Sequence, residues 1–110
     1  MAKTPEGKVK DKVKKLLDTY EGIYYFMPIG TMYSRIGVPD IIGSYQGRFF
    51  AIECKAGSNK PTALQEREME FIRRAGGCVA VINETNIDDI KIMLGNTKLY
   101  WRLHNATNNP

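Results

Sequence analysis

The sequence contains few of the residues that hold soft transition metals. Among 110 residues there is one histidine, His104, and two cysteines, Cys54 and Cys78, which lie far apart and form no C-x-x-C pair. This scarcity argues against a zinc site built from cysteine and histidine clusters. We expect both thiols to be reduced and packed in the interior. Any bound metal would need carboxylate ligands, which favours a hard cation such as Mg²⁺ or Mn²⁺.

Long apolar runs are also absent. No stretch approaches the roughly 20 residues needed to span a bilayer, and the N-terminal segment lacks the apolar core of a secretory signal. We therefore expect a cytoplasmic protein without membrane contact. The net charge of +4 is compatible with a polyanionic partner. Six basic residues fall in the first fifteen positions, however, and they are equally typical of a solvated helix face.

Hydrophobic periodicity and turn residues predict one α/β domain with a mixed sheet flanked by helices, in the order α-β-β-β-α-β-α. Thr4 and Pro5 mark the start of a first helix. The second helix begins at Thr62, with Leu64, Phe71, Ile72 and Ala75 on its expected core face, and ends at Gly76-Gly77. The expected elements are helices over 5–20, 62–75 and 86–94 and strands over 23–27, 39–45, 48–55 and 78–82. The apolar strand 78–82 is typical of a sheet centre.

The two strands joined at Gln46-Gly47 carry the most informative pattern. If these two residues form a tight turn, Asp40 lies directly opposite Glu53 across a β-hairpin. Two opposed carboxylates are destabilising. At a separation of ~4 Å and an effective dielectric of ~20, their repulsion is on the order of 4 kcal/mol. A divalent cation would offset this repulsion, and the pair would supply its oxygen ligands from two strands.

Lys55 follows Glu53 by two residues, so strand alternation places both side chains on one face. Phe50, Ile52 and Cys54 then point the other way, into an apolar core. An ammonium group beside a metal can position a water molecule and stabilise charge on a scissile phosphate. Geometry alone leaves a second interpretation open, because an acid and a Glu-x-Lys in a hairpin often form only a surface salt bridge.

Two further polar residues each have a structural and a functional interpretation. Glu6 lies on the apolar side of the first helix, where it could reach a metal directly or through water, or could simply stabilise the first turn. Thr62 and Gln65 match the capping box, which explains Gln65 without any function. Its functional interpretation is a side chain directed at a water molecule or a phosphate.

The candidate DNA contacts lie in loops near this hairpin. Ser34, Arg35 and Lys60 could contact phosphates, although loop charges are more often only solvated. Arg48 lies at the far end of the hairpin. Tyr24, Tyr25, Phe26 and Tyr33 could stack on bases, but an aromatic strand is more often part of a core.

Four motifs together resemble a known family. The sequence resembles the VRR-Nuc family of the PD-(D/E)XK nuclease superfamily, most closely its short stand-alone phage and bacterial members, from about Glu6 to Ile82. The motifs that carry the resemblance are Gly37-Val38-Pro39-Asp40, Phe50-Ala51-Ile52-Glu53-Cys54-Lys55, Pro61-Thr62-Ala63-Leu64-Gln65 and Gly76-Gly77-Cys78-Val79. A lone D…E-x-K pattern is weak, but these flanking motifs make the match specific.

The resemblance implies a restriction-endonuclease-like core and a metal-dependent phosphodiesterase. Asp40 and Glu53 would ligate Mg²⁺ or Mn²⁺ together with the backbone carbonyl of Cys54. Lys55 would orient the attacking water, Gln65 would support the site, and Glu6 would match the acid of the family's first helix. Cys54 departs from the usual valine or leucine, but it contributes through its backbone. The nuclease domain would span residues 1–96, leaving 97–110 as a C-terminal extension.

The family also implies partners. We expect a homodimer that cuts branched DNA such as Holliday junctions, in the host cytoplasm if the protein is phage-encoded. Two-fold symmetry would place two sites for two opposed strand cuts. A less selective nickase or flap nuclease would use the same residues. A non-catalytic DNA-binding subunit that keeps the nuclease fold is a further alternative, although a pure binder would gain from losing the opposed carboxylates.

Overall fold

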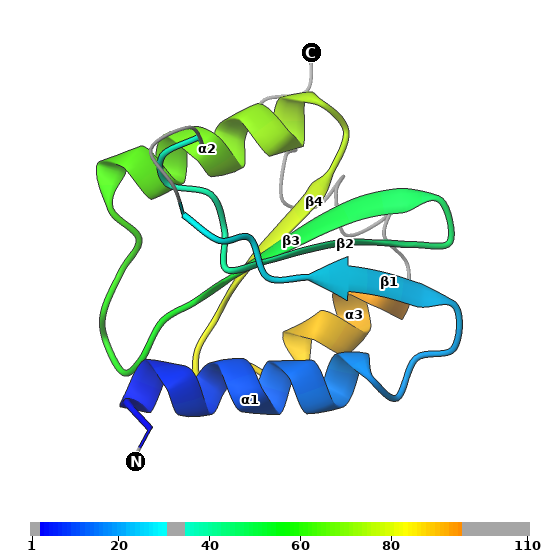
Figure 1. Ribbon diagram of the computed structural model, residues 1–110, viewed down its shortest axis with the longest axis horizontal. Helices are drawn as coiled ribbons and strands as arrows, with labels where there is room; N and C mark the ends of the chain where they lie inside the picture. Colours follow the sequence, from blue (N-terminus) through cyan, green and yellow to red (C-terminus); the bar gives the residue numbers. More distant parts are fainter. Residues whose placement is uncertain (1–2, 31–34, 96–110) are drawn as a thin grey trace.

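A four-stranded sheet separates two layers of helices in the computed structural model, which describes residues 3–30 and 35–95 (Figure 1). Helices α1 (Pro5–Leu17) and α3 (Asp89–Gly95) cover one face, and α2 (Ala63–Arg74) covers the other. The strands lie in the order β1 (Ile23–Phe26), β2 (Ile41–Tyr45), β3 (Arg48–Cys54) and β4 (Cys78–Ile82). The predicted order of elements is confirmed, whereas Tyr33, Ser34, His104 and the extension 97–110 lie outside the described residues. None of the described helices is both long and apolar enough to cross a membrane.

The sheet is mixed. β1, β2 and β3 are antiparallel neighbours, and a two-residue turn joins β2 to β3. α2 carries the chain across to β4, which pairs parallel to β3. The expectation that 78–82 lies in the sheet centre is wrong, since β4 is the edge strand of the described sheet. Its continuous apolar character has another cause: α2 packs on one of its faces and α3 on the other.

Two cores of unequal size hold the layers together. The larger lies between the sheet and α1 with α3, and it contains Phe50, Ile52 and Cys54 at zero exposure, as strand alternation predicted. The smaller lies beneath α2, where Met69 packs with Ala51 and Val79. The second face of the hairpin is therefore also covered over much of its length. The side chains of Cys54 and Cys78 are both buried, as expected.

The β2–β3 hairpin has the register that the sequence predicted. Ile41 pairs with Ile52 and Tyr45 with Arg48, so Gln46 and Gly47 are the two turn residues. Their φ angles of 51° and 79° are those of a tight type I′ turn, which requires positive φ at both positions. Continuing this register by one residue places Asp40 opposite Glu53. The strand itself begins at Ile41, because Pro39 has no N–H to donate to the ladder.

The helices differ from the prediction at their ends and on one face. Thr4 caps α1 as expected, but the helix ends at Leu17 and turns cover the next residues. α3 begins at Asp89, since the Asn86 side chain instead bonds the backbone of Asn83 and Val81. On α2, Leu64 and Phe71 are not core residues, at 45% and 44% exposure. The stripe that faces the sheet is centred on Met69, which leaves these side chains at its margins, and Ala75 is likewise exposed.

Candidate active site

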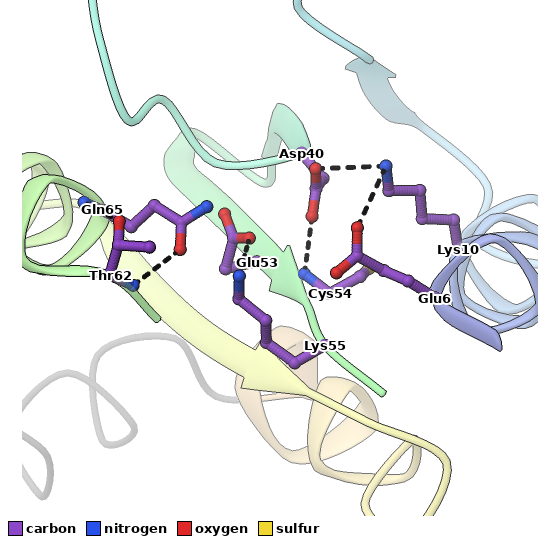
Figure 2. A network of polar contacts seen from close by, with 8 residues as sticks. All are labelled: Glu6, Lys10, Asp40, Glu53, Cys54, Lys55, Thr62 and Gln65. Carbon is purple, nitrogen blue, oxygen red and sulfur yellow. Dashed lines mark hydrogen bonds and ion pairs between the residues drawn. The ribbon is translucent and has the colours of Figure 1, made fainter. Parts of the chain in front are cut away.

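Asp40 lies immediately before β2 and uses its two carboxylate oxygens in different directions (Figure 2). Its Oδ2 accepts a hydrogen bond of 2.8 Å from the backbone N–H of Cys54 on β3. Its Oδ1 lies 3.3 Å from the ammonium nitrogen of Lys10 on α1. The first bond ties Asp40 to the neighbouring strand, so the position of this carboxylate follows directly from the hairpin register.

Glu53 is the most constrained acid of the site. It is 2% exposed, and its Oε1 is buried with no hydrogen-bond partner. Burial, and after it the charge of Asp40, raise the pKa of its carboxyl to about 8, although the nearby charge of Lys55 opposes both effects. A buried polar atom without a partner costs free energy, so this oxygen is suited to a ligand that would complete its contacts.

Lys55 directly follows β3, and its side chain extends to Glu53. Its ammonium nitrogen lies 3.6 Å from Oε2 of Glu53, and its side chain is 12% exposed. The backbone N–H of Lys55 donates to the carbonyl of Ile82 at the end of β4, which fixes the chain as it leaves the sheet. The predicted placement of Glu53 and Lys55 on one face is therefore realised, and the cation beside the acids is largely withdrawn from water.

Gln65 forms the predicted capping box, whereas its functional interpretation stays a prediction. Its Oε1 accepts from the backbone N–H of Thr62 at 2.9 Å, while Thr62 Oγ1 accepts from the backbone N–H of Gln65, so the capping box is complete. The cap uses only the oxygen of the side-chain amide. Figure 2 shows the amide nitrogen turned toward Glu53. The N-terminus of α2 is thus fixed with a hydrogen-bond donor facing the acids.

The first helix contributes two residues, one of which the sequence interpretation missed. Lys10 lies 3.8 Å from Oε2 of Glu6 and also contacts Asp40. Burial lowers the pKa of Lys10, but the charges of Asp40 and Glu6 outweigh it and leave the pKa above its ordinary value. Glu6 therefore lies near the site, as expected. The spacing of four residues between Glu6 and Lys10 is that of a helical ion pair, and this signal was available in the sequence.

The residues present suit a hard cation that has few protein ligands and keeps several waters. Among the described residues, no three histidine, cysteine, aspartate or glutamate side chains form a group able to hold a metal ion. Asp40 and Glu53 instead offer two carboxylates, one of which has the unpartnered Oε1. Magnesium is commonly held by one or two carboxylates and keeps several of its waters. This donor set therefore fits Mg²⁺ or Mn²⁺ and does not fit a closed structural metal site.

A glycine permits the close approach of the Asp40 loop to α2. Gly37 has a φ of 81°, and a Cβ there would lie 2.5 Å from the carbonyl oxygen of Leu64 and 3.0 Å from the backbone nitrogen of Gln65. The loop that carries Asp40 therefore packs backbone against backbone on the turn that carries Gln65. This contact links the two sides of the site.

Gly37→Ala should lower the free energy of unfolding by roughly 1–3 kcal/mol more than Gly22→Ala, because the added methyl group overpacks this contact. Gly22 is the matched control, since its φ of 77° imposes the same conformational cost but nothing lies within 4 Å of its Cβ position. Urea unfolding of both variants measures the difference. Equal destabilisation would contradict the close-contact role of Gly37.

The basic residues predicted to contact DNA differ in their contacts within the protein. Arg35 donates through Nη2 to Oε1 of Glu68 at 3.0 Å and through Nε to Oε2, and its guanidinium lies 5.5 Å from the ring centroid of Phe71. Lys60 is exposed in the loop before α2. Arg48 donates to the carbonyl of Gly76, so it fastens the far end of the hairpin. Glu68, buried on α2, was not singled out in the sequence.

An apolar groove adjoins Asp40 on the α2 face of the sheet. Its volume is about 1350 Å³, and Asp40, Arg35 and Glu68 lie on its wall. Large apolar side chains that line it are between 42% and 81% exposed: Phe26, Ile29, Ile36, Phe49 and Phe71. Exposed apolar side chains in such a cluster mark an interaction surface more often than scattered ones do.

Comparison with known proteins identifies the fold. No protein-family model matches the sequence, and no curated protein matches it. Among solved structures, a VRR_NUC domain protein superposes with a TM-score of 0.63 and 20% identity, over 93% of this chain and 92% of that one. Hjc, a Holliday junction resolvase from the archaeal hyperthermophile Archaeoglobus fulgidus, superposes with a TM-score of 0.51 and 20% identity, over 72% and 69%. The chain has the fold of these proteins, as the sequence resemblance led us to expect.

Proposed function

We propose that this protein is a metal-dependent DNA endonuclease of the VRR-Nuc type that cuts branched DNA. The observation that carries the proposal is the buried Oε1 of Glu53, which has no partner and lies in a site with Asp40 and Lys55. The similarity to a VRR_NUC domain protein and to a Holliday junction resolvase supports this interpretation at the level of fold. A non-catalytic DNA-binding subunit would gain nothing from a buried carboxylate of this kind.

Each residue of the site has a defined task in this proposal. Asp40 and Glu53, with the backbone carbonyl of Cys54, would hold Mg²⁺ or Mn²⁺. A divalent ion at such a site activates a water molecule and stabilises the charge of the phosphodiester transition state. Lys55 would orient the attacking water and offset charge that develops on the phosphate. Gln65 would position a water molecule or a phosphate oxygen through its amide nitrogen.

The proposal also includes a homodimer, and DNA phosphates that contact loop residues near the site. The apolar groove and its exposed phenylalanines and isoleucines offer a surface that a second copy of the chain could cover. Two copies related by a two-fold axis would present two sites to the two strands of a junction. Light scattering would report the mass of the assembly. Ser34, Arg35 and Lys60 remain candidate phosphate contacts.

A substrate panel tests the function. We expect Mg²⁺ or Mn²⁺ to support cleavage of a four-way junction at least tenfold faster than cleavage of linear duplex of the same sequence, at one fixed salt concentration. EDTA and Asp40→Asn should each abolish the reaction. Flap and nicked duplexes complete the panel, and equal rates on all substrates would favour a less selective nuclease. No cleavage of any substrate with either metal would overturn the proposed activity.

A further inference from the structure

Lys10 occupies the space between two of the three acids of the site. Its ammonium nitrogen lies 3.3 Å from Oδ1 of Asp40 and 3.8 Å from Oε2 of Glu6, and the side chain is only 27% exposed. In Figure 2, Lys10 reaches Asp40 from α1, whereas Lys55 meets Glu53 from the end of β3. The two lysines therefore contact different acids: Lys10 contacts Asp40 and Glu6, and Lys55 contacts Glu53.

The charges around Lys10 are closely balanced. Three carboxylates, those of Glu6, Asp40 and Glu53, stand against the two ammonium groups of Lys10 and Lys55. One divalent ion beside the unpartnered Oε1 of Glu53 would already turn this balance positive. A second divalent ion next to Glu6 and Asp40 would have to displace Lys10 from its contacts, against the repulsion between cations at close range.

We propose that Lys10 limits the site to one divalent ion, because its ammonium group takes the position between Glu6 and Asp40 that a second ion would otherwise occupy. This inference rests on the proposed function, since it concerns the number of ions in that same site. It also assigns Glu6 a role: the Glu6 carboxylate holds Lys10 in place and is not itself a metal ligand.

The number of Mn²⁺ ions bound by the metal-free full chain tests the proposal. Calorimetric titration, with free Mn²⁺ followed by electron paramagnetic resonance, should give one ion per chain for the parent. Lys10→Met keeps the length of the side chain but removes its charge, and should bind two ions. The second ion should be lost again in the Glu6→Gln/Lys10→Met double variant, because Glu6 becomes a ligand only when Lys10 is gone.

Two further variants serve as controls for this test. Lys12→Met, an exposed lysine on the same helix with no ion pair in the described structure, should bind one ion like the parent. Lys10→Gln provides a second neutral variant if Lys10→Met does not fold. The inference would be wrong if the parent bound two ions. It would also be wrong if the neutral Lys10 variants bound only one ion, whatever its affinity. No ion bound by any of these proteins would contradict the proposed function itself.

Discussion

Replacing Lys55 with methionine should slow DNA cleavage by roughly 10²–10³-fold, the loss typical of removing one group that stabilises transition-state charge. The ammonium nitrogen lies 3.6 Å from Glu53, and no other described cation forms an ion pair with that carboxylate. Methionine preserves the aliphatic length of the side chain, which is 12% exposed, so the fold should remain intact. Single-turnover cleavage of a junction with Mn²⁺ measures the effect.

A matched lysine separates this effect from a general loss of charge. Lys91 lies on α3, where it forms an exposed pair with Asp88 at 3.3 Å, far along the chain from the hairpin. Lys91→Met should therefore cleave at the parental rate, and thermal unfolding should be similar for both variants. If Lys55→Met cleaves as fast as Lys91→Met, then Lys55 has no part in the reaction and the proposed site is wrong.

The metal-free protein should lose stability as the pH rises from about 4.5 to about 8, because Glu53 must ionise in a buried position. The folded-state pKa of this carboxyl is raised to about 8 from its ordinary value of 4.5, so the folded state binds the proton more tightly than the unfolded state. The stability that comes from this tighter proton binding is complete below pH 4.5 and is lost as the pH rises through about 8. Chemical unfolding in EDTA across this range measures the loss.

Glu53→Gln is the variant that isolates this effect. A glutamine has nearly the same shape and does not ionise, so the variant should show a flatter pH dependence and exceed the parent in stability near pH 8 without metal. Mn²⁺ should raise the stability of the parent at pH 8 but not that of the variant, since a ligand that binds only the folded state stabilises it. Glu21→Gln, at an exposed turn, should behave like the parent. Identical pH profiles for Glu53→Gln and the parent would contradict the buried titration.

The hairpin and its acid pair could be predicted from the sequence because their determinants are local. The Gln46-Gly47 turn and the alternation of Phe50, Ile52 and Cys54 fix the register, and that register determines where Asp40 meets Glu53. The capping box at Thr62 was equally local. For such features, a few neighbouring residues contain all the information that the geometry needs.

Contacts between elements were less predictable. Lys10 joins the site only because α1 packs beside the end of β3, and the helical spacing of Glu6 and Lys10 alone gives no sign of Asp40. The orientation of α2 shows the same limit, since its apolar residues alone favoured Leu64 and Phe71 as core. In the structure, Met69 instead packs at the centre against Ala51 and Val79, and Glu68 is buried and bonded to Arg35.

The type I′ turn between β2 and β3 has a consequence for how the site assembles during folding. Asp40 and Glu53 are joined by a short hairpin, so bringing them together closes only a small loop and costs little chain entropy. Hairpins of this kind form within microseconds. The two principal acids can therefore meet before the helices dock, whereas Gln65 and Lys10 must wait for contacts distant along the chain. The repulsion between the acids thus arises early in folding, when water still surrounds both groups and weakens it.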